Sequence, residues 1–242
     1  VLASFVPIII FPYYSVIGGW VTKYLASFIG GEVQAAAGDN YFTAFISQTG
    51  GPILWFSLFL GITAVIVILG VEKGIEKVSK IMMPILVLLT LVIAIYTCTI
   101  DGAMDGVIYY LKPNFKNFSV KTILAAMGQL FYSMSLAMGI MVTYGSYMKK
   151  ENHLEGAVRQ IEIFDTGIAF LAGLMIIPGV FAFTGGDQSA LSAGPGLMFI
   201  TLPKVFNSMP MGGLIGTVFF LLDLLAALTS AISLMETIVS II

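Results

Sequence analysis

Long apolar runs without a single charge restrict what this chain can fold into. Such runs cover positions 1–22, 40–71, 81–100, 122–148, 166–186 and 205–222. A helix of about 20 apolar residues crosses a hydrocarbon core that is about 30 Å thick. Because backbone groups find no water inside lipid, each crossing must be helical or belong to a closed barrel, and runs this long are not barrel strands. We therefore expect an all-α membrane protein, with the lipid bilayer as its solvent.

Composition agrees with a place in the bilayer. Hydrophobic residues fill 58% of the 242 positions and charged residues only 10%, whereas about 25% are charged in a soluble domain. A net charge of −2 supplies no basic face for nucleic acid. The single cysteine, Cys98, excludes an internal disulfide and a multi-cysteine metal site. Because the chain starts and stops inside apolar stretches, we interpret it as a fragment of a longer protein.

The apolar pattern predicts one membrane domain, 1–242, with about six transmembrane helices. They are expected over 1–28, 53–71, 79–99, 121–148, 161–184 and 211–241. The lysine-bearing connections at 72–80 and 149–159 are expected on the cytoplasmic side by the positive-inside rule. The connection 185–210 then lies outside, and its apolar second half after Gly194-Pro195-Gly196 fits a helical hairpin that dips into an outer vestibule.

Small, hydroxylated and glycine residues gather in the centre of the fourth predicted helix, between Gly128 and Gly139. A transporter can break a helix at such a place, which exposes carbonyls and half-helix dipole ends at the membrane midplane. Close helix packing through small residues is the alternative. This segment alone does not decide between the two.

Asp165 stands at the start of the fifth predicted helix, next to an uncharged run. An intramembrane carboxylate is costly and indicates function, here a hard oxygen ligand for a cation or a proton acceptor. Glu162 stands one turn earlier, so a position at the water interface is the alternative.

The sixth predicted helix carries two adjacent hydroxyls, Thr229 and Ser230, one turn after Ala226. Together with a backbone carbonyl, they supply three oxygens of the kind that sodium prefers. Hydrogen bonds to their own helix are the alternative explanation. Asp223 could face a wet cavity and Glu236 could lie near the cytoplasmic end, and neither is assigned a role.

Three further residues stand out. Pro84 removes a backbone donor early in the third predicted helix and leaves a carbonyl one turn back for water or an ion, although an ordinary kink would also explain it. Tyr14 needs a partner for its hydroxyl inside a membrane, and a substrate carboxylate is one candidate beside an interfacial position. His153 falls in a charged loop and is expected to be solvated.

Taken in order, these segments resemble the neurotransmitter:sodium symporter family, and specifically its bacterial amino-acid members. The resemblance runs through essentially the whole chain. It rests on Tyr13-Tyr14-Ser15-Val16-Ile17-Gly18-Gly19-Trp20, Gly74-Ile75-Glu76-Lys77 through Met83-Pro84, Gly128 to Gly139 followed by Thr143-Tyr144-Gly145-Ser146-Tyr147, Gly196 through Thr201-Leu202-Pro203, and Leu228-Thr229-Ser230. It implies part of the inverted-repeat, leucine-transporter-like fold, covering the third to eighth of about twelve helices, in a multi-pass cell-membrane protein of a bacterial inner membrane.

The resemblance also implies roles at matching positions. Ser133 and Asp165 would supply oxygens to a first sodium site, and Tyr132 would close over the substrate as an aromatic lid. The Ala226 carbonyl with the Thr229 and Ser230 hydroxyls would form half of a second sodium site. The implied substrate pocket, with an apolar or aromatic preference, comprises Ile10, Tyr14, Tyr132, Ser133, Ser135, Met138, Ser230 and Leu234. Gly74 and Pro84 match a pair that lets the family's fifth helix unwind and admit water from inside.

Two departures from the family pattern matter. The family's first helix, which supplies other sodium ligands and much of the substrate cradle, is absent from this sequence. Asp165 stands where many relatives have asparagine. Because a fixed carboxylate there would supply the negative charge that animal relatives take from chloride, we do not expect chloride to be required.

These expectations converge on sodium-coupled symport of an amino acid, hydrophobic or aromatic, by alternating access. No enzyme chemistry and no cofactor beyond the co-transported sodium ions is expected, because the sequence carries no phosphate loop and no nucleophile with a partnered base. The alternative keeps the architecture but couples transport to protons, with Asp165 as the proton site, or to another ion. A passive channel or scaffold would instead show no accumulation against a gradient.

Overall fold

Helices build the whole of the described structure. The computed structural model describes residues 2–136, 138–148, 153–187, 191 and 194–241, so the loop lysines Lys149 and Lys150 lie outside the described residues. No strand occurs within these ranges, and the expected all-α fold is confirmed. The helices are α1 (Leu2–Ile29), α2 (Val33–Ala36), α3 (Tyr41–Ile46), α4 (Gly50–Ile68), α5 (Lys77–Cys98), α6 (Ala103–Leu111), α7 (Val120–Ser133), α8 (Ile140–Tyr147), α9 (Leu154–Thr184), α10 (Leu202–Ser208) and α11 (Gly212–Ile241).

Among the described residues, five helices are long and apolar enough to cross a membrane. The spans are Phe5–Ile29, Gly50–Ile68, Gly74–Cys98, Leu154–Thr184 and Gly212–Ile241, so the chain is a multi-pass membrane protein. The ends of α1, α4, α5 and α11 differ from the sequence prediction by three residues or fewer. Helix α9 begins seven residues earlier than predicted, at Leu154. Its first turns are exposed and carry charges, because a helix can continue past the lipid boundary that hydropathy detects.

The fourth predicted span, 121–148, is broken rather than continuous. Helix α7 ends at Ser133 and α8 begins at Ile140. Ser135 takes a left-handed backbone conformation with a φ of 54°. The N–H of Leu136 bonds the carbonyl of Phe131 at 2.9 Å, and the N–H of Ser135 bonds that of Tyr132 at 3.1 Å, which together form a Schellman ending. Of the two explanations for the small-residue segment, the structure shows the break.

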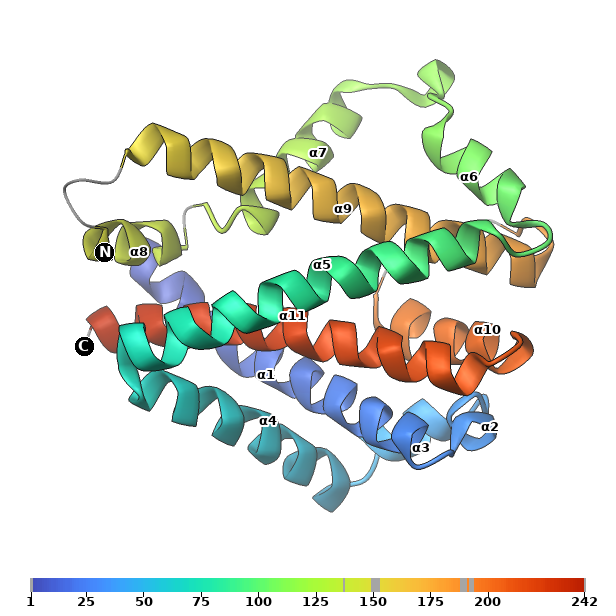
Figure 1. The fold of residues 1–242 in the computed structure, drawn as a ribbon, viewed down its shortest axis with the longest axis horizontal. Coiled ribbons are helices and arrows are strands. Elements are labelled where there is room, and N and C mark those ends of the chain that lie inside the picture. The colour runs from blue at the N-terminus through green and yellow to red at the C-terminus, as the bar shows by residue number, and fades with distance from the viewer. Residues whose placement is uncertain (1, 137, 149–152, 188–190, 192–193, 242) are drawn as a thin grey trace.

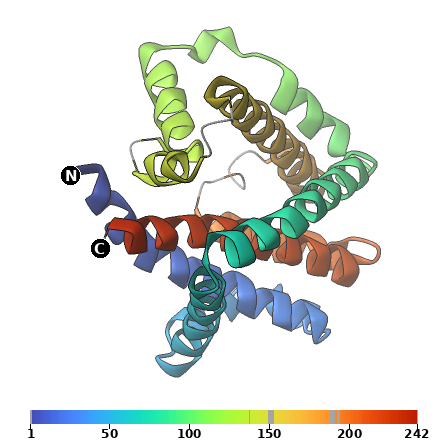
Figure 2. The same cartoon turned by 60° about the vertical axis from the view of Figure 1, so that its left-hand side comes forward.

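Helices α5 and α11 cross the middle of the molecule (Figure 1). On one side α1 packs along both α11 and α4, and on the other α9 packs along α5. The approach of α1 to α11 is close enough that a β-carbon at Gly216 would overlap the Phe28 ring. After a 60° turn, α7, α8 and α9 are seen on one side of α11 and α4 on the other (Figure 2). This arrangement makes α11 the helix that faces both groups.

The connections gather at two opposite ends. Helices α2, α3, α6 and α10 lie at one end, whereas α8 and both chain termini lie at the other (Figure 1). This separation fits the predicted alternation of outer and cytoplasmic loops. The segments that join the predicted helices at 29–52 and 100–120 contain the short helices α2, α3 and α6, which the apolar pattern did not predict.

The predicted outer hairpin is helical in its second half. A π-helical segment, Leu197–Thr201, runs directly into α10. Helix α10 buries Leu202, Val205 and Phe206 and packs against α2 and α11. The apolar residues after Gly196 are therefore part of the packed core at the outer end, which explains why this connection is as hydrophobic as a span.

Candidate functional site

The broken helix places Ser133 directly against Asp165. The Ser133 hydroxyl donates a 2.6 Å hydrogen bond to Oδ1 of Asp165, across 32 positions of sequence. Ser133 is the last residue of α7, and Asp165 lies inside α9, half-buried, while Glu162 is exposed. Both residues that the sequence assigned to a first sodium site therefore lie at one place, next to the helix break.

The oxygens assigned to a second sodium site lie together on α11. Thr229 Oγ1 donates a 2.9 Å hydrogen bond to the Ala226 carbonyl, as the alternative explanation for this hydroxyl predicted. The bond brings the two oxygens side by side, and the hydroxyl oxygen keeps lone pairs that can accept or ligate. Ser230 is exposed within the described chain, and its hydroxyl interacts with that of Tyr14.

Four of the residues predicted to line a substrate pocket pack together in one apolar cluster. Met138 and Leu234 form a buried cluster with Ile140, and the side chains of Ile10 and Tyr14 pack against it. Four of the predicted pocket residues from three separate segments thus share one apolar site. Of the other predicted pocket residues, Tyr132 is exposed and Ser135 is half-buried in the helix break.

The start of α5 is irregular, as the Gly74 and Pro84 pair implies. Residues Val71–Glu76 form a π-helical segment that leads into α5. A β-carbon at Gly74 would overlap the carbonyl oxygen of Ile66, so only glycine fits there. Pro84 lies inside α5 without interrupting it, and its missing N–H leaves the Lys80 carbonyl without the usual helical partner.

A polar seam between α8 and α11 was missed from the sequence. Tyr147 donates a 2.6 Å hydrogen bond to Glu236, which is buried. The Tyr144 and Ser233 hydroxyls bond at 2.8 Å, and further contact comes from Thr143 and Ser240 at 3.2 Å. The spacing of 233, 236 and 240 places three polar residues on one helix face, and this periodicity could have revealed the seam.

Asp223 lies one turn before Ala226 on α11. Its Oδ2 is buried and has no hydrogen-bond partner among the described residues. It is close enough to Tyr14 to interact electrostatically with that side chain. A wet cavity around Asp223 stays a prediction.

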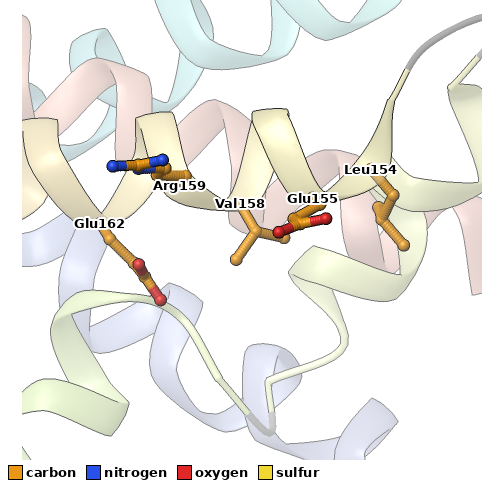
Figure 3. A pocket seen from close by; sticks show the side chains of 5 residues that line it. All are labelled: Leu154, Glu155, Val158, Arg159 and Glu162. Atoms are coloured by element: carbon orange, nitrogen blue, oxygen red, sulfur yellow. The ribbon is translucent and has the colours of Figure 1, made fainter.

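A separate shallow hollow lies at the start of α9, away from these residues. Leu154, Glu155, Val158, Arg159 and Glu162 line it, with a volume of about 450 Å³ (Figure 3). These side chains are exposed, as is that of His153, which agrees with the solvated position predicted for the histidine. The hollow shares no residue with the predicted site.

Five membrane-length helices among the described residues, together with a further span that is broken at mid-length, define a multi-pass membrane protein. The model of the sodium:neurotransmitter symporter family matches residues 39–242. The chain belongs to this family, and the resemblance seen in its motifs is confirmed.

Named relatives agree with this assignment. An uncharacterized sodium-dependent transporter of Bacillus subtilis (strain 168), YhdH, is 38% identical over 235 residues, which cover 96% of this chain and 51% of the relative. An uncharacterized sodium-dependent transporter of Haemophilus influenzae is 34% identical over 238 residues, with the same two coverages. The human sodium- and chloride-dependent creatine transporter 1 is 29% identical over 177 residues, 69% of this chain and 27% of that protein.

A solved structure shares the fold. The crystal structure of MhsT in complex with L-phenylalanine superposes with a TM-score of 0.86 at 38% identity, covering 98% of this chain and 54% of that one. The leucine-transporter-like fold expected from the motifs is thereby confirmed. The chain spans about half the length of the bacterial relatives and of this structure.

Proposed function

We propose that the full carrier containing this chain transports an amino acid together with sodium by alternating access. The observation that carries the proposal is the hydrogen bond from Ser133 to Asp165 beside the broken helix. Such a break brings half-helix ends and oxygen ligands to one point inside the membrane, where an alkali cation must exchange its hydration shell for protein oxygens. Membership of a sodium symporter family supports sodium as the coupling ion.

The electrostatics at the end of α7 favour a cation. The last carbonyls of a helix carry a partial negative charge, and those of α7 end at Ser133. The Asp165 carboxylate adds a full negative charge at the same place. A monovalent cation bound there would neutralise a carboxylate that is otherwise costly inside the membrane. In this scheme Ser133 and Asp165 ligate a first sodium, and Ala226, Thr229 and Ser230 ligate a second.

The pocket favours an apolar or aromatic side chain on the substrate. Ile10, Met138 and Leu234 offer only apolar atoms, and they lie beside the ring of Tyr14. The Tyr14 hydroxyl, at the edge of this cluster, is the donor for the substrate carboxylate. The similar protein MhsT was solved with L-phenylalanine, which supports a hydrophobic or aromatic amino acid as the substrate here.

Proton coupling is the second candidate, and the carboxyl group of Asp165 is the observation that favours it. A carboxyl that accepts a hydrogen bond inside a membrane helix can also take up a proton. In that case the Asp165 carboxylate would take up one proton and release it again in each transport cycle, and sodium would be dispensable.

Uptake by the full-length carrier in proteoliposomes separates the two candidates. Radiolabelled L-phenylalanine uptake is measured with sodium outside and then with choline in its place, at one fixed pH. The proposal predicts accumulation with sodium and its loss with choline. Uptake that persists in choline and follows an imposed pH gradient would select the proton-coupled carrier.

We also expect the full carrier to lie in the inner membrane of a bacterium. Its uptake should not fall when gluconate replaces chloride in the buffer.

A further inference from the structure

Tyr24 of α1 reaches across the outer end of the molecule to the hairpin. Its hydroxyl donates a 2.8 Å hydrogen bond to the backbone carbonyl of Phe199, 175 positions away. Tyr24 is 0% exposed and Phe199 is 1% exposed, so the bond is enclosed by the described chain itself. No role in transport has yet been given to Tyr24.

The sequence explains why this carbonyl needs an outside donor. In an α-helix the Phe199 carbonyl would accept a bond from the N–H of residue 203, four positions later. That residue is Pro203, which has no N–H. The Leu197–Thr201 segment is π-helical at this point, and the N–H of Leu202 bonds Leu197 instead. Pro203 removes the α-helical donor to the buried Phe199 carbonyl, and the Tyr24 hydroxyl bonds this oxygen from outside the segment.

Aromatic rings surround this bond. The Phe199 ring stacks on Phe42 at 5.2 Å between centroids and meets the Trp20 ring edge-on at 5.8 Å. The Tyr24 ring itself lies 5.1 Å from that of Phe199. Ring packing is tolerant of small displacements, whereas a hydrogen bond requires defined distances and angles. The Tyr24 bond is therefore the contact that fixes how deeply this segment sits against α1.

We propose that Tyr24 is a positioning residue for the outer gate. Its hydroxyl donates to the Phe199 carbonyl, whose α-helical donor Pro203 removes. This bond fixes the depth of the helical hairpin over the outer end of α1, and α1 also carries Tyr14. The inference rests on the proposed function, because a hairpin position matters to transport only if the carrier alternates access. Loss of the hydroxyl would leave the rings packed but the hairpin less firmly seated.

The test uses the full-length carrier with native cysteines replaced and a single cysteine at the buried position 205 of α10, introduced as Val205→Cys. A membrane-impermeant maleimide reports how often the hairpin lifts, in sodium and L-phenylalanine. Tyr24→Phe removes only the hydroxyl. Tyr41→Phe is the matched control, because Tyr41 packs on the Tyr24 ring and its hydroxyl bonds Ser27 rather than the hairpin.

The labelling rate should rise about tenfold in Tyr24→Phe, the scale expected for an unsatisfied buried carbonyl, and less than twofold in Tyr41→Phe. Pro203→Ala restores an N–H at position 203 that can bond the Phe199 carbonyl. In that background, Tyr24→Phe should change labelling less than threefold. Equal labelling of Tyr24→Phe and the unmodified carrier, or an undiminished effect beside Pro203→Ala, would overturn the proposal.

Two further outcomes are separable. If Tyr24→Phe is not recovered from the membrane, the proposal predicts recovery of the double variant Tyr24→Phe, Pro203→Ala, and failure of that variant counts against it. If the unmodified carrier shows no sodium-dependent uptake while Tyr24→Phe still raises labelling, the proposed function fails but the seating of the hairpin by Tyr24 stands.

Discussion

Ser133 and Asp165 are joined by a 2.6 Å hydrogen bond between the end of α7 and the interior of α9. The bond joins the last residue of α7, at the helix break, to a side chain inside α9. It places a hydroxyl and a carboxylate side by side at the end of a helix. Because this arrangement is what a desolvated cation requires, the pair is the centre of the proposed ion site.

Asp165→Asn should strongly weaken the affinity of the carrier for sodium. The amide keeps the shape and one acceptor oxygen but removes the negative charge that offsets the cation. We expect the sodium concentration for half-maximal uptake to rise roughly 10–100-fold, the range seen when groups that support a metal ligand are lost. Uptake titrated with sodium measures this, with and without chloride. Chloride should restore part of the activity of Asp165→Asn and leave the unmodified carrier unaffected. Chloride dependence of the unmodified carrier would contradict this.

Thr229→Val should weaken sodium binding at the second site without unfolding the protein. The substitution keeps the branched shape but removes the hydroxyl that lies 2.9 Å from the Ala226 carbonyl. We expect uptake to require roughly tenfold more sodium while the protein stays folded, since a hydroxyl bonded within its own helix contributes little to stability. Thr217→Val is the control, because its hydroxyl also bonds within α11, to Gly213, far from the site. Equal sodium titrations for the two variants would speak against the second site.

Tyr14→Phe should impair substrate binding far more than Tyr13→Phe. The Tyr14 side chain packs beside the predicted pocket, whereas Tyr13 is 62% exposed on a different helix face. Removing a hydroxyl that binds a charged carboxylate costs ~1.5–3 kcal/mol, which corresponds to about a 10–150-fold weaker affinity. Competition binding of L-phenylalanine to the two purified variants measures the difference. Similar affinities would exclude Tyr14 as the carboxylate donor.

The ion pair between Asp39 and Lys204 predicts a pH-dependent contact at the outer end. The hydrogen bond and the charge of Lys204 lower the pKa of Asp39 below its usual value of 3.8. A lowered pKa means that the contact stabilises the fold above about pH 3.8 and is lost as the pH falls below it. Asp39→Asn should therefore lower the Tm slightly at pH 7, and the difference in Tm should shrink as the pH falls from 3.8 through the lowered pKa of Asp39. High salt should narrow the difference at pH 7, and a difference that does not shrink as the pH falls would refute this prediction.

Tyr147→Phe tests the seam between α8 and α11. Glu236 is buried, and Tyr147 donates to it, so the variant would leave a buried carboxyl without this donor. We expect the free energy of unfolding to fall by ~1.5–3 kcal/mol. Tyr144→Phe, which removes a neutral pair with Ser233, should cost only ~0.5–1.5 kcal/mol. Thermal unfolding of both variants in detergent gives the order, and the reverse order would contradict it.

The helices were predictable from the sequence because lipid permits few alternatives. Charge-free runs predicted the ends of α1, α4, α5 and α11 closely. This is because the length of an apolar run and the thickness of the membrane both constrain the length of a spanning helix. The start of α9 was misplaced because Glu155 and Arg159 belong to a helix that extends beyond the apolar run. The residues between Ser133 and Ile140 indicated two outcomes, and only three-dimensional structure showed the Schellman ending at Ser135.

Family motifs proposed the members of the candidate site, whereas the contacts between them were not predicted. Family motifs identified Ser133 and Asp165, yet no spacing rule relates positions that lie 32 residues apart on separate helices. The bond from Tyr24 to Phe199 was unpredictable for the same reason, although Pro203 marks the carbonyl that needs a partner. Polar residues that pair across helices are set by packing, which local patterns do not encode.

Binding of radioactive sodium to the purified full-length carrier tests the ion site most directly. It is measured without a membrane gradient, for the unmodified protein and for Ser133→Ala, Asp165→Asn, Thr229→Val and Ser230→Ala. We predict saturable binding to the unmodified protein and a clear loss of affinity in each variant, with Ser208→Ala as an unaffected control at the outer end. Sodium affinity that is unchanged in all four variants would contradict the assignment of these oxygens as its ligands.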